Sequence, residues 1–268
     1  MTTRGAIRSG IGGWTFEPWR GVFYPDSLKQ ADELHFASRA LTTIEINSTY
    51  YSSQKPETFA KWAAATPEGF IFSVKASRFS TNRKVLADGG ESIERFLNQG
   101  IVELGDRLGP IVWQMALTKK FEPDDLAGFL KLLPEKLEGM PLRHVVEIRH
   151  ESFRDPAFIA LCKARNVAIC LSEDARYECV PDVTADFVYA RLMKGDDRLK
   201  TAYPAKDMKR WAERFVDFAE GGRPDDLPYV TSEAPPKRSR DAFVYFIHEA
   251  KVRAPAAAQA FLKVVKGL

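Results

Sequence analysis

Eight short apolar runs recur along the chain, each about as long as a β-strand and rich in Val, Ile, Phe or Tyr. Several of them are apolar at consecutive positions, which is typical of parallel strands that helices cover. The predicted strands are Ile7–Gly13, Thr42–Asn47, Phe70–Ala76, Pro110–Met115, His144–Arg149, Val167–Leu171, Phe187–Leu192 and Phe243–His248.

Most of the segments between these runs have helical periodicity and helix-start signals. Pro56 and Glu57 suit the first turn of a helix, and Pro123 and Pro255 open two others. Residues 92–104 place their apolar side chains on one face, which predicts an amphipathic helix. The alternation of strands and helices therefore predicts an α/β fold.

A single (β/α)₈ TIM barrel over residues 1–268 accounts for this alternation, with a doubly wound open sheet as the alternative. Two intervals fit poorly. The sequence SEDARYECVPDVTAD after the sixth predicted strand leaves room for only an incomplete helix. The interval before the last strand is long and proline-rich, and its basic run PPKRSR at 235–240 is interpreted as a solvated loop at the bottom of the barrel.

Polar side chains gather at the downstream ends of the predicted strands, where TIM barrels carry their sites. In RHVVEIRH, the side chains of Val145, Glu147 and Arg149 share one face and climb toward the mouth of the barrel. The predicted catalytic residues are Glu45, Lys75 and Glu147. The predicted ligand-binding residues are Trp14, Asn47, Tyr50, Gln114, Arg149, Asp174, Arg191 and His248.

Structural ion pairs are the alternative explanation for these charges. Glu147 with Arg149, or Glu45 with Lys75, could neutralise one another inside the barrel. A whole ring of polar groups nevertheless favours a ligand pocket, because apolar residues of similar volume would be at least as stable. Basic residues in the third and seventh loops favour an anionic ligand. The aromatic residues of GWTFEPWRGVFYP could form pocket walls, but most are expected to anchor that loop.

Composition narrows the function class only modestly. A net charge of +3 does not by itself argue for nucleic acid, and nothing in the chain predicts a membrane span or a signal peptide. The odd number of cysteines, three, is interpreted as reduced thiols in a cytoplasmic protein. Four histidines are too few for a histidine-rich zinc site, and no cofactor or metal is predicted. One Mg²⁺ or Mn²⁺ held by Glu45, Glu147 and Asp174 is the alternative.

Several blocks resemble the YecE-like family, domain of unknown function 72. They are GIGGWTFEPWRGVFYP, TTIEINSTYY, PETFAKWAAATPEGFIFSVKASRFST, LGDRLGPIVWQ, HVVEIRHESF and YFIHEAKVRAPAAAQAFL. The resemblance implies a TIM barrel without an established reaction. The family pattern matches at Trp14, Trp19, Glu45, Asn47, Tyr50, Tyr51, Lys75, Gln114, Glu147, Arg149 and Tyr203. The chain departs from the pattern at QMALT, where the family has Gln-Leu-Pro-Pro, and at RLMKG, where it has Arg-x-His-Gly.

These observations predict a mixed-charge pocket that binds or converts a small polar or anionic ligand, such as a sugar-, phosphate- or nucleotide-like compound. An enzyme built on it would be a hydrolase, lyase or isomerase that uses carboxylate acid–base chemistry. Two alternatives stay open. One is a nucleic-acid-binding or repair-type protein, by analogy with endonuclease-IV-like barrels. The other is a non-catalytic ligand-binding scaffold, favoured by the absent histidine in RLMKG.

Overall fold

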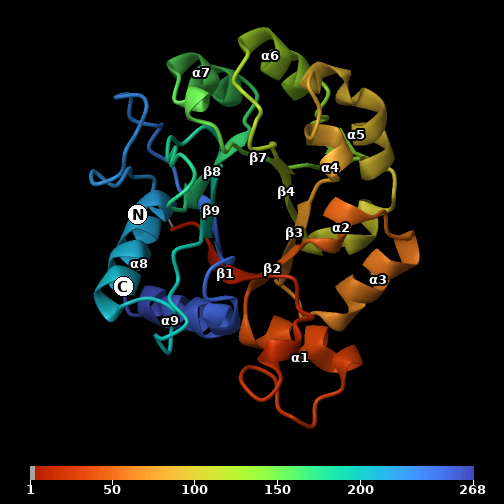
Figure 1. Ribbon diagram of the computed structural model, residues 1–268, viewed down its shortest axis with the longest axis vertical. Helices are drawn as coiled ribbons and strands as arrows, with labels where there is room; N and C mark the ends of the chain where they lie inside the picture. The colour runs from red at the N-terminus through yellow and green to blue at the C-terminus, as the bar shows by residue number, and fades with distance from the viewer. Residues whose placement is uncertain (1–3) are drawn as a thin grey trace.

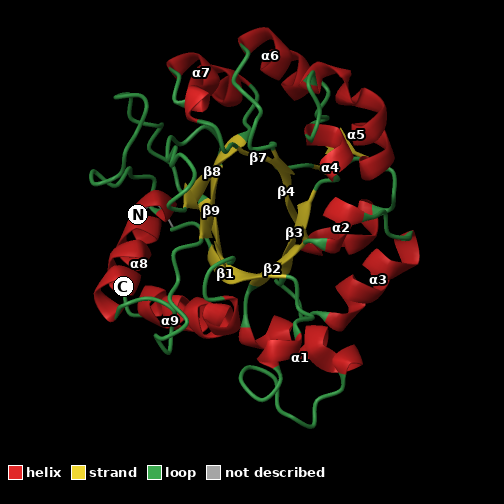
Figure 2. Cartoon of the chain, viewed as in Figure 1, coloured by secondary structure: helices red, strands yellow, loops and turns green. Residues whose placement is uncertain are grey.

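The computed structural model describes residues 4–268, so Met1–Thr3 of the predicted domain lie outside the described residues. Its centre is a closed barrel of parallel strands in the order β1-β10-β9-β8-β7-β4-β3-β2 (Figures 1 and 2). The barrel strands are β1 (Ile7–Gly12), β2 (Thr43–Ile46), β3 (Ile71–Lys75), β4 (Leu108–Gln114), β7 (His144–Glu147), β8 (Ala168–Glu173), β9 (Phe187–Leu192) and β10 (Asp241–Phe246).

All eight predicted strands are present, and the TIM barrel is confirmed. The open-sheet alternative is wrong, because β1 pairs with β2 on one side and with β10 on the other. A small antiparallel pair, β5 (Lys136–Leu137) and β6 (Met140–Pro141), lies outside the barrel and carries no periodic signal that the sequence could show.

The helices surround the barrel on its outer side (Figure 2). They are α1 (Glu33–Ala40), α2 (Ser48–Tyr51), α3 (Pro56–Ala65), α4 (Arg78–Thr81), α5 (Gly90–Leu97), α6 (Pro123–Lys131), α7 (Pro156–Ala164), α8 (Ala205–Ala219) and α9 (Ala254–Lys266). Short 3-10 helices cover Glu17–Trp19, Gln30–Asp32, Leu86–Gly89, Ile101–Arg107, Glu151–Phe153 and Lys251–Arg253. As predicted, β8 and β9 are joined without a full helix; residues 174–186 form none. No helix within residues 4–268 is both long and apolar enough to span a membrane.

The predicted helix over residues 92–104 is wrong in its second half. α5 ends at Leu97, and a separate 3-10 helix begins at Ile101. Gly100 between them has φ 103°, and a Cβ there would lie 2.7 Å from the Cα of Pro56. The chain therefore breaks the helix where it passes close to the start of α3, a contact that an apolar periodicity does not reveal.

Alternate residues of the barrel strands point into the barrel and outward to the helices, as expected for β-strands. Val145 packs inside the barrel with Val112 and Cys170, whereas Val146 and Ile148 belong to the core between barrel and helices. Every residue of β2, β7 and β9 is buried. A charge on an inward-facing position of these strands must therefore find its partners inside the barrel or at its mouth.

Loop one, residues 13–32, is anchored by its aromatic residues as expected. Trp19 and Tyr24 are buried, and the Trp19 Nε1 donates a hydrogen bond of 2.8 Å to the carbonyl of Lys251. The Tyr24 hydroxyl donates to the carbonyl of Trp14 at 2.5 Å. These bonds fix the loop beside the segment that follows β10.

The interpretation of PPKRSR as a solvated loop is wrong at its last residue. Arg238 is exposed, but Arg240 is 1% exposed, because its backbone joins β10 to the end of α8 through the Ala219 carbonyl. Its guanidinium donates to the carbonyl of Pro236. The residue thus belongs to the closure of the barrel bottom and is not part of a free basic surface.

Replacing Gly10 by alanine tests the close contact between β1 and β2. The added Cβ would fall 1.7 Å from the Thr43 carbonyl oxygen, so the two strands must separate. We expect Gly10→Ala to lower the free energy of unfolding by about 3 kcal/mol or more in urea denaturation. The control is Gly90→Ala in α5, where φ is −50° and the nearest atom, in Leu132, is 3.8 Å away. Equal stability of the two variants would contradict this strand contact.

Candidate functional site

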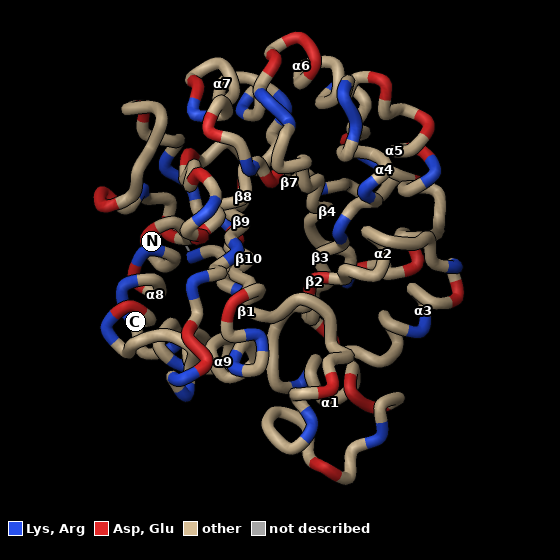
Figure 3. The backbone as a smooth tube through the Cα atoms, viewed as in Figure 1, with Lys and Arg blue, Asp and Glu red and all other residues tan. Residues whose placement is uncertain are grey.

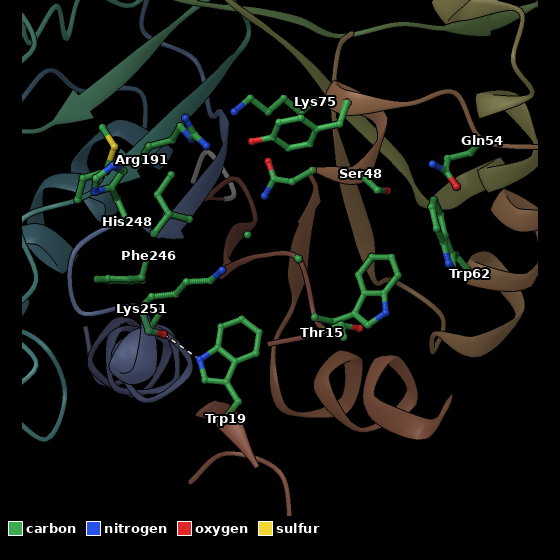
Figure 4. A pocket seen from close by; sticks show the side chains of 18 of the residues that line it. Thr15, Trp19, Ser48, Gln54, Trp62, Lys75, Arg191, Phe246, His248 and Lys251 are labelled. Atoms are coloured by element: carbon green, nitrogen blue, oxygen red, sulfur yellow. Dashed lines mark hydrogen bonds between the residues drawn. The ribbon is translucent and has the colours of Figure 1, made fainter. Parts of the chain in front are cut away.

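A cavity of about 670 Å³ opens at the carboxyl-terminal ends of the barrel strands (Figure 4). Its lining comes from the ends of β1, β2, β3, β7, β9 and β10 and from the loops after them. Six of the predicted site residues line it: Trp14, Asn47, Lys75, Arg149, Arg191 and His248. Five others lie beneath it or beside it: Glu45, Tyr50, Gln114, Glu147 and Asp174. Acidic and basic positions lie close together along the barrel strands (Figure 3).

Arg191 on β9 binds both buried glutamates below the cavity. Its Nη1 donates to the Glu147 Oε2 at 2.6 Å and its Nη2 to the Glu45 Oε1 at 2.8 Å. The Tyr189 hydroxyl donates to the other Glu45 oxygen at 2.6 Å, and the Gln114 amide donates to Glu147 at 2.8 Å. Both glutamates are 0% exposed, so this network forms a sealed polar layer.

The charges of this layer stabilise one another. Burial alone would raise the pKa of Glu147, but Arg191, Arg149 and Lys75 together lower it to about 2. Burial likewise disfavours the charged Arg191, yet Glu147 and Glu45 raise the pKa of its guanidinium. Glu147 is therefore ionised at neutral pH. Its two oxygens accept hydrogen bonds from Gln114 on β4, Arg191 on β9 and Arg149, which follows β7.

Arg149, two residues beyond Glu147, connects this layer to the cavity. Its Nη2 lies 3.1 Å from the Glu147 Oε1, which realises the ion pair that the sequence offered as the alternative. The guanidinium carbon lies 4.7 Å from the centre of the Tyr177 ring. Within residues 4–268 its Nη1 has no hydrogen-bond partner, and Arg149 lines the cavity. It can therefore pair with Glu147 and still donate to a ligand.

Lys75 at the end of β3 does not form the pair with Glu45 that the sequence offered as an alternative. Its Nζ lies 4.5 Å from the centre of the Tyr50 ring, and the residue is 8% exposed. Across the described chain, no hydrogen bond or ion pair engages this amine. Burial first and Arg191 second lower the pKa of Lys75 to about 8. Figure 4 shows Lys75 and Arg191 pointing toward each other at one side of the cavity.

Asn47 follows β2 and lies at the floor of the cavity. Its amide nitrogen approaches Gly12 so closely that a Cβ on Gly12 would lie 2.8 Å from it. The Asn47 Oδ1 is buried and has no hydrogen-bond partner within the described residues. A buried acceptor without a donor costs free energy, which a ligand hydroxyl or N–H would recover.

Asp174 and His248 meet at one rim of the cavity through Arg176. The Asp174 carboxylate accepts from the Arg176 Nε at 2.9 Å and Nη2 at 2.7 Å, and these bonds lower its pKa. The same Nη2 lies 3.2 Å from the His248 Nε2. Asp174 is therefore engaged at the rim. The alternative metal site on Glu45, Glu147 and Asp174 finds no support in this arrangement, because no three His, Cys, Asp or Glu side chains among residues 4–268 come together as a potential metal site.

The opposite wall of the cavity is largely apolar. Trp14 contacts Trp62 of α3 edge-to-face at a centroid distance of 5.1 Å, whereas Phe246 lies across the cavity from Trp62, near His248 and Lys251 (Figure 4). Lys251 lies 4.1 Å over the Phe16 ring and points into the cavity (Figure 4). Sequence reasoning missed Trp62 and Lys251 as site residues. Both residues lie within blocks that resemble the family, which was the available signal, but Trp62 also has the pattern of a helix core residue.

Removing the guanidinium of Arg191 tests the sealed layer. Arg191→Met would leave Glu45 and Glu147 buried without their shared cation, so we expect a loss of about 3–5 kcal/mol in the free energy of unfolding at pH 7. The matched control is Arg210→Met, which breaks the exposed pair with Asp207 and should cost at most about 0.5 kcal/mol. Similar costs for both substitutions in urea denaturation would argue against the layer.

The pH dependence of stability tests the ionised state of Glu147. Its folded pKa of about 2 is below the ordinary value of 4.5, so its ionised form stabilises the fold above pH 4.5. That contribution, roughly 3 kcal/mol, is lost as the pH falls from about 4.5 toward 2. Glu147→Gln should therefore be less stable than the unsubstituted protein at pH 7 and approach it in acid. A stability difference that stays constant from pH 7 to pH 3 would contradict this assignment.

Comparison with known proteins identifies the family to which the chain is similar. The family model described as Protein of unknown function DUF72 matches residues 8–267. A crystal structure of a DUF72 family protein from Thermotoga maritima MSB8 is similar, with a TM-score of 0.70, 22% identity and 98% of each chain covered. Another, from Enterococcus faecalis V583, has a TM-score of 0.68, 15% identity and 98% of each chain covered.

These two likenesses concern the fold, because both identities are low. No curated protein matches the chain. The resemblance found in the sequence is confirmed by the family model, which covers nearly every residue from β1 to the end of α9. The chain belongs to the DUF72 family of proteins of unknown function.

Proposed function

We propose that the cavity binds a small molecule that carries a carboxylate or phosphate group and an apolar or aromatic portion. One observation carries the proposal. Both buried glutamates turn toward Arg191, while Lys75 and Arg149 face the cavity with donors to spare. An anionic group is the ligand feature that such donors recognise.

The charge balance of the site supports an anion. Four cationic side chains line the cavity: Lys75, Arg149, Arg191 and Lys251. The two carboxylates directly beneath them, Glu45 and Glu147, offset two of these charges and leave an excess of two positive charges. At the rim, Asp174 and Arg176 neutralise each other. Opposite charges attract strongly where water is partly excluded, so a ligand anion would complete the balance.

The rest of the ligand would be recognised by the apolar wall and by Asn47. The cavity volume of about 670 Å³ suits a compound of metabolite size. Trp14 and Trp62 offer ring surfaces against which an apolar or planar group can pack. The unpartnered Asn47 oxygen would accept a hydrogen bond from a ligand hydroxyl or N–H group.

In this proposal Glu45 and Glu147 are positioning residues. Neither lines the cavity, and their oxygens already accept hydrogen bonds from Arg191, Arg149, Tyr189 and Gln114. Acid–base catalysis by either carboxylate, the predicted chemistry of a hydrolase, lyase or isomerase, would first require it to release Arg191. Tyr50 acts through Lys75, and Asp174 acts through Arg176 on His248.

The other predicted functions have less support. Within residues 4–268, two of the basic features that suggested nucleic acid give it little support. Arg83 is held by the carbonyls of Phe79 and Asp88, and the basic run at 235–240 precedes β10, at the end of the barrel away from the cavity. A non-catalytic scaffold is compatible with ligand binding as proposed here. We place this function in the cytoplasm, which agrees with three free cysteines.

A thermal-shift screen with matched anionic and uncharged compounds tests this function. We expect carboxylates and phosphates to raise the melting temperature more than their amides or dephosphorylated forms. The effect should fall at least about tenfold in apparent affinity in Lys75→Met and Arg149→Gln, because each loses a charge-assisted hydrogen bond.

The control variants are Lys237→Met and Arg238→Gln, which remove the same charges from the exposed bottom loop and should bind as the unsubstituted protein does. Equal binding of uncharged analogues, or unchanged binding by the cavity variants, would refute an anion site. A steep loss of oligonucleotide binding with added salt would instead favour nucleic acid.

A further inference from the structure

Among the cavity cations of residues 4–268, Lys75 is the one whose position anion binding alone explains least. All four oxygens of Glu45 and Glu147 accept hydrogen bonds from other donors: Arg191, Tyr189, Gln114 and Arg149. Lys75, 8% exposed as a residue, lines the cavity with its amine against the Tyr50 ring and beside two guanidinium groups. A buried ammonium without a paired carboxylate is costly, and a guanidinium would grip an anion better.

We propose that Lys75 is a nucleophile that forms an imine with a carbonyl substrate, an oxo acid or a phosphorylated ketone or aldehyde. This inference rests on the proposed function, since the anionic group is what Arg149 would hold. It goes beyond that function by assigning covalent chemistry to one atom, the Lys75 Nζ. Primary amines desolvated beside another cation are the usual form of such nucleophiles.

The chemistry needs no further reactant. The Lys75 nitrogen attacks the carbonyl carbon, and a C–N bond forms as the C=O bond opens to a carbinolamine. The C–O bond then breaks, and the oxygen leaves as water with two of the three hydrogens of the original ammonium. The product is an iminium with one N–H and one positive charge, so the charge balance with Glu45 and Glu147 is unchanged.

The surroundings of Lys75 favour the reactive form. Burial and Arg191 lower its pKa to about 8, while Glu147 and Glu45 act in the opposite direction and Arg149 adds to the lowering. Near neutral pH the unprotonated fraction of this amine is then on the order of a hundredfold larger than that of an ordinary lysine. Lys251 also lines the cavity, and burial lowers its pKa too. It is therefore the other lysine of the cavity that could form the imine.

Reductive trapping tests the inference on the full chain. The probes are pyruvate and dihydroxyacetone phosphate, with acetone and dihydroxyacetone as uncharged counterparts, each in the presence of borohydride. Peptide mass mapping should find the reduced adduct at Lys75 at least about tenfold above any other lysine, with the charged probes favoured. The labelling rate should rise with pH and level off above about pH 8.

Lys75→Arg separates this inference from anion binding, because arginine keeps the charge but forms no imine of this kind. We expect Lys75→Arg to lose the adduct while it still binds carboxylates and phosphates in the thermal-shift assay. Lys237→Arg at the bottom loop is the matched control and should label as the unsubstituted protein does.

Three results would overturn the inference. One is an adduct spread evenly over the lysines or centred on Lys251. Another is no adduct at Lys75 although pyruvate or the phosphate probe stabilises the protein. In that second case the anion site stands and the covalent step fails. The third is a protein that neither binds the anions nor forms an adduct, which would refute both proposals.

Discussion

The bidentate use of Arg191 is the interaction on which the mouth of this barrel depends. One guanidinium satisfies a carboxylate from β2 and another from β7, two strands that do not pair with each other. Three side chains that would each be costly to bury alone thereby form one layer across the barrel, and Arg149 on Glu147 brings its net charge to zero. The layer closes the apolar interior below and provides a rigid floor for the cavity above.

This arrangement decides which chemistry the cavity offers. Both carboxylates pair with Arg191 below the cavity. The cavity surface is therefore cationic, although the sequence places acidic and basic residues in nearly equal number at the strand ends. Because both glutamates pair with Arg191, Lys75 has no carboxylate partner among the described residues. The charged residues that the sequence predicts at the barrel mouth therefore form two layers. The lower layer holds the carboxylates paired with Arg191, and the upper layer holds the hydrogen-bond donors that line the cavity.

Much of the fold could be predicted because it depends on local periodicity. Eight apolar runs became eight strands, and the period of two placed Glu147 and Arg149 on the inner face. The division of the polar residues between cavity and floor could not be predicted, since it depends on whether Arg191 pairs across the barrel. Trp62 enters the cavity through a contact with Trp14 far away in the sequence. The buried Arg240 likewise depends on a neighbour, α8, that no local pattern reveals.

The closed strand order has a consequence for how the chain matures. β1 is completed on one side by β2, but its other side pairs with β10, which begins at Asp241. As the ribosome delivers the polypeptide, the first strand keeps an open edge until β10 has emerged, and open edges invite intermolecular pairing. Intermolecular pairing at this edge is therefore a hazard of the nascent chain until the last barrel strand is in place.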